Sequence, residues 1–242
     1  MTRLLTRIGL VGLVASIGCE RPARAPEAPP SSEAASAGTP ASIDDQMHAH
    51  LGAVRAIHLA LINDDLVTAQ ARARELSRMP AAGEPGVWER PMRFVRAQAL
   101  RLASTTSARD ARHLSTELAT VCADCHMVHA RAARFQAPPE PPDDGSLRGA
   151  MARHQWAAET MWIGLVGPST DLWRDGLAAI TAPPLPALAL PQHSRHADIE
   201  QLRLKLVAVA ARTRKLPGQG DRARRLAQIV DICAACHAIA RP

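Results

Sequence analysis

The pattern Cys-x-x-Cys-His occurs twice in this chain, at residues 122–126 and 233–237. Two cysteines at this spacing, followed directly by a histidine, are the pattern by which c-type haem is attached. The two thiols bond the two vinyl groups of one haem as thioethers, and the histidine lies beneath the iron as its proximal ligand. Because two copies in a chain of 242 residues are hard to ascribe to coincidence, we predict two covalently attached haem c groups.

Other readings of the cysteines exist. A single copy could be a redox dithiol or half of a zinc site. An all-cysteine zinc site would need both pairs to converge on one tetrahedron, and it would leave both histidines unexplained. We therefore predict that the thioether cysteines are Cys122, Cys125, Cys233 and Cys236, and that the proximal iron ligands are His126 and His237.

The remaining cysteine, Cys19, follows a segment typical of protein export. Residues 1–18 have a basic start and an apolar core that is too short to anchor stably in a bilayer. Residues 16–19 (Ser-Ile-Gly-Cys) resemble the lipobox of bacterial lipoproteins, with serine where leucine is usual. Cleavage before the cysteine would leave Cys19 lipidated and anchored to a membrane. The alternative is an ordinary signal peptide that ends slightly later, and both readings predict an exported, periplasmic protein.

Two further segments divide the chain. Residues 19–42 are rich in Pro, Ala, Ser and Glu, and cannot bury enough apolar surface to offset their ordering entropy, so we expect a flexible tether. Residues 136–145 contain four prolines, which no helix could traverse. We therefore predict a proline-rich linker there, between a first domain at 43–135 and a second at 146–242.

The two halves repeat one another. Aligning the haem motifs without gaps sets residues 94–126 against 205–237. Farther upstream, Met-x-x-His at 47–50 corresponds to Met-x-x-His at 151–154, seven residues out of step. Each half therefore carries Met-x-x-His near its beginning and Cys-x-x-Cys-His at its end.

The composition favours helices, because Ala, Leu and Arg dominate and the aromatic and β-branched runs of strands are scarce. Ser42 is a plausible N-cap for the first helix. Short connections favour antiparallel neighbours, so the predicted fold is all-α, with two tandem four-helix bundles that each carry a C-terminal Cys-x-x-Cys-His. We expect helices at 43–63, 66–78, 88–103 and 108–132 in the first half, and at 147–166, 172–180, 198–216 and 221–239 in the second.

The position of the motif resembles that of the class II cytochromes c, the cytochrome c-prime group. In that family the motif lies on the last helix of a four-helix bundle, whereas the mitochondrial-like type carries it near the start, with a ligand methionine far downstream. His237 lies almost at the end of the chain, as the first arrangement requires. The resemblance covers both halves and rests on motif position and helix count. It implies that His126 and His237 are the proximal ligands.

The distal side of each haem would decide the mechanism. In low-spin members of the family the sixth ligand comes from the beginning of the first helix, whereas the gas-binding members cover this face with an apolar side chain. Met-x-x-His offers two candidates per haem on neighbouring turns of one helix face. Methionine would give a higher potential and bis-histidine ligation a lower one. We predict His50 and His154 as the distal ligands, with Met47 and Met151 as the alternatives.

The other candidates for a role at the haem lack a repeat partner of their own type. We expect Met161 to pack in the core, and the tryptophans to pack in the haem pockets or the core. The histidines expected at the surface or in a second shell around the site are His48, His58, His113, His129, His193 and His196.

These features lead to an exported dihaem c-type cytochrome that carries single electrons between redox protein partners and is not an enzyme. The alternative is a five-coordinate haem module that binds NO or CO, and a dihaem peroxidase is less favoured. No nucleic acid partner is expected: the formal net charge of +6 includes two arginines of the leader, and haem propionates would offset the rest. The basic residues are scattered and form no recognised reader motif.

Overall fold

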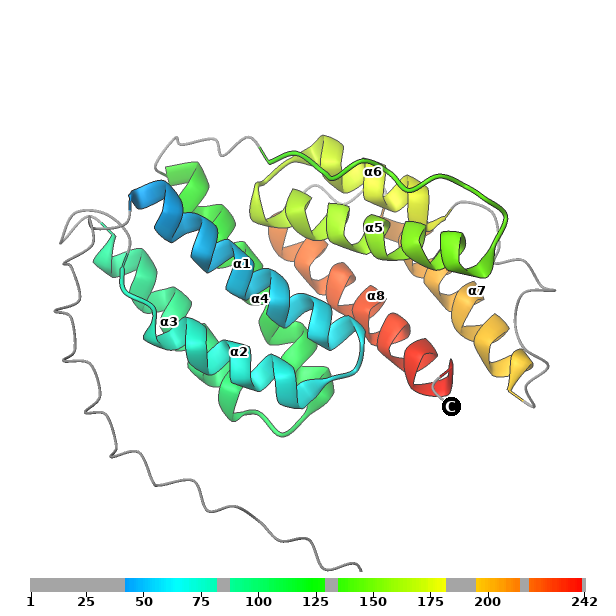
Figure 1. The fold of residues 1–242 in the computed structure, drawn as a ribbon, viewed down its shortest axis with the longest axis horizontal. Helices are drawn as coiled ribbons and strands as arrows, with labels where there is room; N and C mark the ends of the chain where they lie inside the picture. Colours follow the sequence, from blue (N-terminus) through cyan, green and yellow to red (C-terminus); the bar gives the residue numbers. More distant parts are fainter. Residues whose placement is uncertain (1–41, 82–87, 129–134, 182–194, 214–217, 241–242) are drawn as a thin grey trace, which may run out of the picture. The chain divides into compact units, whose positions relative to one another are not determined.

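The computed structural model describes residues 42–81, 88–128, 135–181, 195–213 and 218–240, and within these ranges it contains eight helices and no strand (Figure 1). The predicted signal peptide, Cys19 and all of the predicted tether before Ser42 lie outside the described residues. None of the described helices has the length and apolar character needed to cross a membrane. The helices are α1 (Ile43–Ile62), α2 (Leu66–Arg78), α3 (Glu89–Ser104), α4 (Ala108–Val128), α5 (Leu147–Val166), α6 (Thr170–Ile180), α7 (His196–Thr213) and α8 (Gln219–Ala240).

The all-α class is confirmed, and most helix ends lie within two residues of their predicted positions. Ser42 caps α1 as expected: its hydroxyl accepts from the Asp45 N–H at 3.1 Å, and the Asp45 carboxylate accepts from the Ser42 N–H at 3.2 Å. The start of α6 is two residues earlier than predicted, because the Ser169 hydroxyl caps it by accepting from the Leu172 N–H at 3.3 Å. The predicted ends of the fourth and seventh helices fall outside the described residues.

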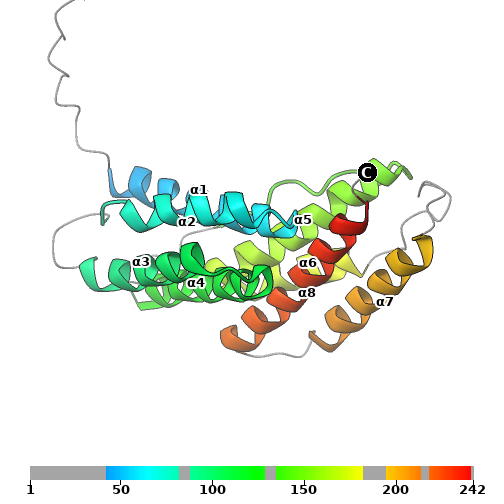
Figure 2. The same cartoon turned by 90° about the horizontal axis from the view of Figure 1, so that it is seen from below.

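The helices of the two halves pack on one another as well as among themselves (Figures 1 and 2). In the first half α1 contacts α2 and α4, while α3 contacts α2 and α4; in the second half α5 contacts α6 and α8, while α7 contacts α6 and α8. Between the halves, α4 packs against α8 and α5, and α1 packs against α8. Residues 41–242 form one compact unit, and buried side chains from all eight helices form one continuous apolar core.

Contacts between α1 and α5 join positions that the repeat makes equivalent. In the register of the Met-x-x-His repeat, Arg55 corresponds to Glu159 and His58 to Trp162. Arg55 and Glu159 form an ion pair, and the rings of His58 and Trp162 stack with centroids 5.4 Å apart and planes 16° apart. Contacts between equivalent residues are the mark of a two-fold arrangement. The two halves are therefore related by an approximate two-fold axis that passes between α1 and α5.

The prediction that His58 could lie at the surface was wrong. This side chain is 1% exposed, and the ring of Trp162 from α5 stacks on it. Met161 is fully buried in the core, as predicted. His48 and His196 are exposed and His113 is half-buried. The predictions for His129 and His193 lie outside the described residues.

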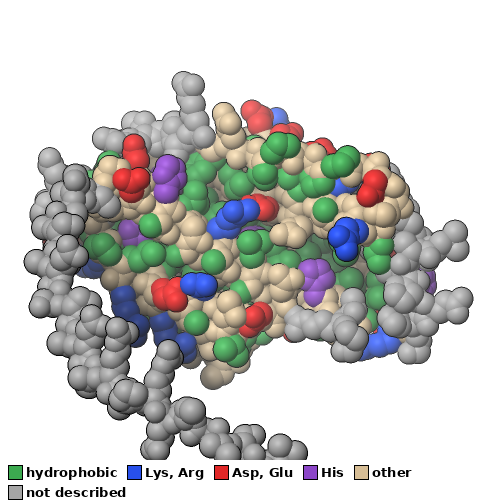
Figure 3. All heavy atoms as spheres, in the orientation of Figure 1, with side chains coloured by type: hydrophobic (Ala, Val, Ile, Leu, Met, Phe, Trp, Pro, Cys, Tyr) green, Lys and Arg blue, Asp and Glu red, His purple; other side chains and the backbone are tan. Residues whose placement is uncertain are grey.

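The segment between α4 and α5 lies along the surface of α5 (Figure 1). Residues 135–144 have no regular secondary structure, as four prolines require. The Trp156 indole donates to the Pro138 carbonyl at 2.6 Å, and Arg153 binds Glu140 at 2.9 Å and Asp143 at 2.8 Å. On the face shown in Figure 3, acidic and basic side chains are interspersed with apolar ones.

Candidate haem sites

The first candidate site is a pocket between α1, α3 and α4 with a volume of about 540 Å³, which we term the first pocket. The predicted residues Met47, His50, Cys122, Cys125 and His126 all line it. The beginning of the first half and its final helix, which are far apart in the sequence, therefore meet at one cavity.

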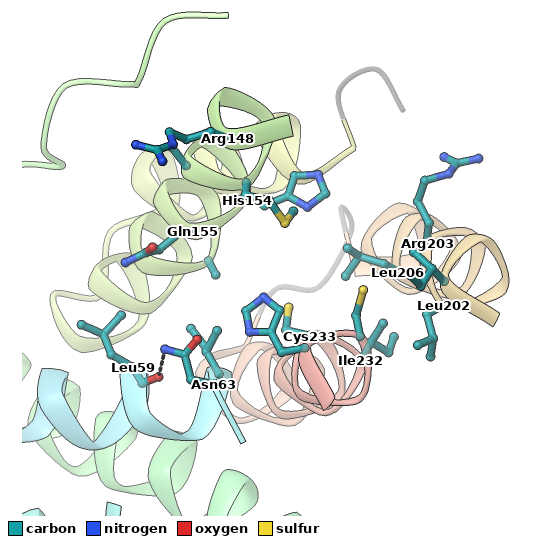
Figure 4. A pocket seen from close by; sticks show the side chains of 17 residues that line it. Leu59, Asn63, Arg148, His154, Gln155, Leu202, Arg203, Leu206, Ile232 and Cys233 are labelled. Carbon is teal, nitrogen blue, oxygen red and sulfur yellow. Dashed lines mark hydrogen bonds between the residues drawn. The ribbon is translucent and has the colours of Figure 1, made fainter. Parts of the chain in front are cut away.

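The second candidate site is a pocket between α5, α7 and α8 with a volume of about 350 Å³, which we term the second pocket (Figure 4). It is lined by the equivalent residues Met151, His154, Cys233, Cys236 and His237. Figure 4 shows His154 reaching from α5 into the space above α8, where Cys233 lies. All the candidate residues of the second half thus face one cavity.

The helical conformation of the motif explains how its three functional side chains come together. Cys122, Cys125 and His126 stand at positions i, i+3 and i+4 of α4, so they share one face of the helix. Between them, Ala123 is fully buried in the core. The motif in α8 repeats this arrangement, with Ala234 1% exposed. A small buried residue fixes the rotation of each helix and turns the thiols and the imidazole toward the pocket.

The thiols are free, and burial disfavours their thiolate form. The four described cysteines form no disulfide. Burial raises the pKa of the Cys122 and Cys233 thiols to about 12, and it also raises the pKa of Cys125 and Cys236. A redox dithiol needs the opposite shift, because the thiolate is the reactive form. The two pairs line different pockets, and the described residues contain no cluster of three or more His, Cys, Asp or Glu suited to a metal ion, so they do not form an all-cysteine zinc site.

His50 is a buried polar group inside the first pocket. Its side chain is 8% exposed, and neither ring nitrogen has a hydrogen bond of good geometry among the described residues. Burial lowers the pKa of His50, although the backbone oxygens of Gln46 and Pro80 oppose this shift. Buried polar atoms that lack a hydrogen bond of good geometry are unusual in a native protein, and a metal ligated by one of the ring nitrogens would supply a partner here. The neighbouring candidate Met47 is half-buried, and its thioether is only a weak acceptor that does not require a hydrogen bond.

His154 occupies the equivalent position in the second pocket and is half-buried. Burial is the main cause that lowers the pKa of this imidazole, and the positive charges of Arg153, Arg203 and His237 add to it. The influence of His237 reflects the proximity of the two histidines on either side of the pocket. A neutral imidazole is the form that binds a metal ion.

His126 has a defined hydrogen bond to another residue that lines the first pocket. Its Nδ1 lies 2.9 Å from the carbonyl oxygen of Val166, at the end of α5. Because a carbonyl only accepts, Nδ1 is the donor of this bond, and in a neutral ring Nε2 would then keep its lone pair. The ring also contacts Phe135, with centroids 5.4 Å apart and planes tilted by 46°. Nε2 is thus the ring nitrogen that could bind a metal, and the ring is held on two sides by Val166 and Phe135.

Several residues around the pockets were not predicted from the sequence. Val166 lines the first pocket although it belongs to the second half, and Leu59, Ile62 and Asn63 line the second pocket although they belong to the first. Ile62 and Val166 occupy equivalent positions in the repeat. Once one of them is found at the pocket of the other half, the repeat predicts the same placement for its counterpart.

The aromatic side chains are distributed unequally. Trp88 and Phe135 line the first pocket, whereas no Phe or Trp is found among the described residues that line the second. Trp162 and Trp173 are buried in the core instead, at 1% and 2% exposure.

No family model, curated protein or solved structure matches this chain. The fit of a haem is therefore judged on the residues themselves. Both pockets have volumes in the range usual for small-molecule and cofactor sites, and each combines apolar walls with a few convergent polar groups. Two thiols and an imidazole on one wall are the donor set that a covalently attached haem requires, and the second imidazole on another wall could serve as a sixth ligand.

Proposed function

We propose that this chain is an exported dihaem c-type cytochrome, which carries single electrons between redox protein partners and is not an enzyme. The observation that carries the proposal is the convergence, in each of two pockets, of Cys-x-x-Cys-His with a histidine from the first helix of the same half. The two patterns stand at opposite ends of each half in the sequence, so their meeting in both pockets supports the proposal.

The helix contacts support the finer description of the fold. In our proposal α1–α4 and α5–α8 are two four-helix bundles with a C-terminal haem motif, which together resemble a duplicated class II cytochrome c. The proline-rich segment at 136–145 then links a bundle at 43–135 to a bundle at 146–242. The successive contacts within each group of four helices favour this division, although the two groups also share a core.

In each site the motif would hold the haem covalently. Cys122 and Cys125 would bond one haem, with His126 as proximal ligand. The second haem would be held in the same way by Cys233, Cys236 and His237. The haem supplies a centre that gains and loses one electron, while the protein determines burial, ligation and solvent access.

On the distal side we propose His50 and His154, rather than Met47 and Met151, as the sixth ligands. His50 is the stronger case, because ligation would satisfy a buried ring that has no hydrogen bond of good geometry. Two imidazole ligands on each iron give a lower potential than imidazole with thioether. A six-coordinate iron that keeps its ligands in both oxidation states suits electron transfer.

The proposed location follows from the N-terminal sequence, with a signal peptide at 1–18, a lipid on Cys19 and a tether that holds the protein at a membrane. The variant Cys19→Ser tests the anchor. We expect it to move the protein from the membrane fraction to the soluble periplasmic fraction without loss of haem. An unchanged distribution would favour the ordinary signal peptide.

The test of function is spectroscopy of the full-length protein, matured in a host that attaches c-type haem. We expect two covalent haems per chain by mass and a low-spin spectrum in both oxidation states. His50→Ala should convert one haem to a high-spin form that binds CO, whereas Met47→Ala should not. His48→Ala is the matched control, because His48 lines the same pocket but is exposed.

The other outcomes identify the alternatives. A loss of the low-spin signal in Met47→Ala alone would assign the ligand to methionine. A wild-type protein that is high-spin and binds CO readily would overturn the electron carrier in favour of a gas-binding module. Rapid turnover of hydrogen peroxide would favour a peroxidase.

A further inference from the structure

The C-terminal end of α5 takes two of its hydrogen bonds from distant side chains. The last four carbonyls of any helix have no partner within it. In α5, the carbonyls of Ile163 and Gly164 accept hydrogen bonds from backbone N–H groups just after the helix. The other two accept from elsewhere: the Leu165 carbonyl from the Gln219 side-chain amide at 3.3 Å, and the Val166 carbonyl from His126 Nδ1 at 2.9 Å.

The bond from His126 to Val166 joins the two halves of the chain. His126 belongs to the motif of the first half, whereas Val166 ends the first helix of the second half. Val166 is 1% exposed, so water has little access to compete for its carbonyl. The negative end of the helix dipole further strengthens an N–H donor at this position.

The arrangement around the second pocket is reciprocal. Ile62, the last residue of α1, is equivalent to Val166 and lines the second pocket together with His237. The contact of α1 with α8 likewise mirrors the contact of α5 with α4. Each pocket is thus closed by the end of the first helix of the opposite half, as two-fold packing requires.

We propose that each half of the chain positions the proximal histidine of the other half, and that the Val166 carbonyl sets the orientation and donor strength of His126. The inference rests on the proposed function, because a proximal role needs the haem. A hydrogen bond at Nδ1 raises the basicity of a ligating imidazole and so favours ferric iron. Loss of the bond should therefore raise the midpoint potential of the haem on Cys122 and Cys125.

The test uses two substitutions at equivalent positions, Gly167→Pro and Asn63→Pro. Proline forces the preceding residue out of the helical conformation, which turns the carbonyl of Val166 or of Ile62 away from its present direction. We expect Gly167→Pro to raise the potential of the first-half haem only, and Asn63→Pro to shift the second-half haem only. Each variant would then act on the haem of the opposite half.

Two controls separate the carbonyl from its surroundings. A Cβ at residue 167 would lie 2.2 Å from Phe135, so Gly167→Ala makes the same collision as proline but keeps the backbone conformation. Gln219→Leu removes the neighbouring bond to Leu165 without touching His126. We expect Gln219→Leu to leave the first-half potential close to that of the wild type, and Gly167→Ala to shift it less than Gly167→Pro does. The two haems are told apart by NMR, since among the described residues Trp or Phe side chains, Trp88 and Phe135, line the first pocket and not the second.

If a proline variant fails to fold, a measurement on the wild-type protein still tests the proposal. The Nδ1 proton of His126 should exchange slowly with solvent and resonate far downfield. Rapid exchange would overturn the proposal, as would a shift confined to the haem of the mutated half, or an equal shift in Gly167→Ala. If two covalent low-spin haems are present in such an outcome, the proposed function stands and only the cross-positioning fails. A protein without covalent haem would instead refute the proposed function.

Discussion

At the scale of single residues, His58 has the clearest energetic cost. It is 1% exposed, its Nε2 has no hydrogen-bond partner among the described residues, and burial lowers the pKa of its imidazole from 6.5 to about 3. Between these two pH values the unfolded chain binds a proton that the folded chain does not. The free energy of unfolding contributed by this site therefore falls as the pH drops from 6.5 toward 3, by about 1.4 kcal/mol per pH unit.

We predict that His58→Phe stabilises the protein. Phenylalanine keeps a ring against Trp162 and removes the unpaired nitrogen. We expect removal of this nitrogen to raise the free energy of unfolding by about 1 kcal/mol at pH 7. The advantage over the wild type should grow by about 1.4 kcal/mol for each pH unit below 6.5. Urea unfolding at pH 7, 6 and 5 measures it. His58→Leu should show the same pH trend at lower stability, and an advantage that does not depend on pH would contradict a neutral buried His58.

At the scale of elements, α5 and α6 meet through two glycines. A Cβ on Gly164 would lie 2.6 Å from the backbone nitrogen of Trp173, and a Cβ on Gly176 would lie 2.6 Å from the backbone oxygen of Ala157. Because these neighbours are backbone atoms, they cannot move aside without separating the helices. The glycines therefore set the close approach of α5 and α6.

We predict that Gly176→Ala lowers the free energy of unfolding by more than 2 kcal/mol, since overpacking costs about 1–3 kcal/mol and the colliding atoms here include backbone. Gly52→Ala is the matched control: Gly52 is exposed within α1, and its Cβ would meet nothing within 4 Å. It should stabilise the protein by about 0.5–1 kcal/mol through helix propensity. Chemical denaturation measures both, and equal effects of the two variants would disprove close packing at Gly176.

The sequence predicted the elements well and their mutual packing poorly. The helices and their caps follow from local signals such as Ser42 and the prolines at 136–145, which act on neighbouring residues only. The convergence of His50 with Cys122 followed from a resemblance and from the repeat. The packing of α4 on α8 could not be predicted, because an apolar stripe shows that a helix face is buried but not which helix covers it. For the same reason Val166 carried no sign of its bond to His126.

At the scale of the whole molecule, the shared core predicts cooperative unfolding. Buried residues from α1 to α8 form one cluster across the segment at 136–145. Neither half could separate without exposing part of that cluster to water. We therefore predict a single unfolding transition, coincident in far-ultraviolet circular dichroism and in haem absorbance. Two resolved transitions would show that the halves unfold independently.

A polar link across the halves is centred on Arg112 of α4, whose side chain is 11% exposed. Its guanidinium binds Asp231 of α8 and also Asp64, in the turn after α1, at 3.2 Å. We predict that Arg112→Met lowers the free energy of unfolding by about 2–3 kcal/mol, because it leaves two partly buried carboxylates without this partner. Adding Asp231→Leu should recover part of the loss, with a coupling of about 1–2 kcal/mol in the double-mutant cycle. Additive effects would mean that the link does not hold the halves together. In that case the apolar contacts of α4 with α8 would carry the interface alone.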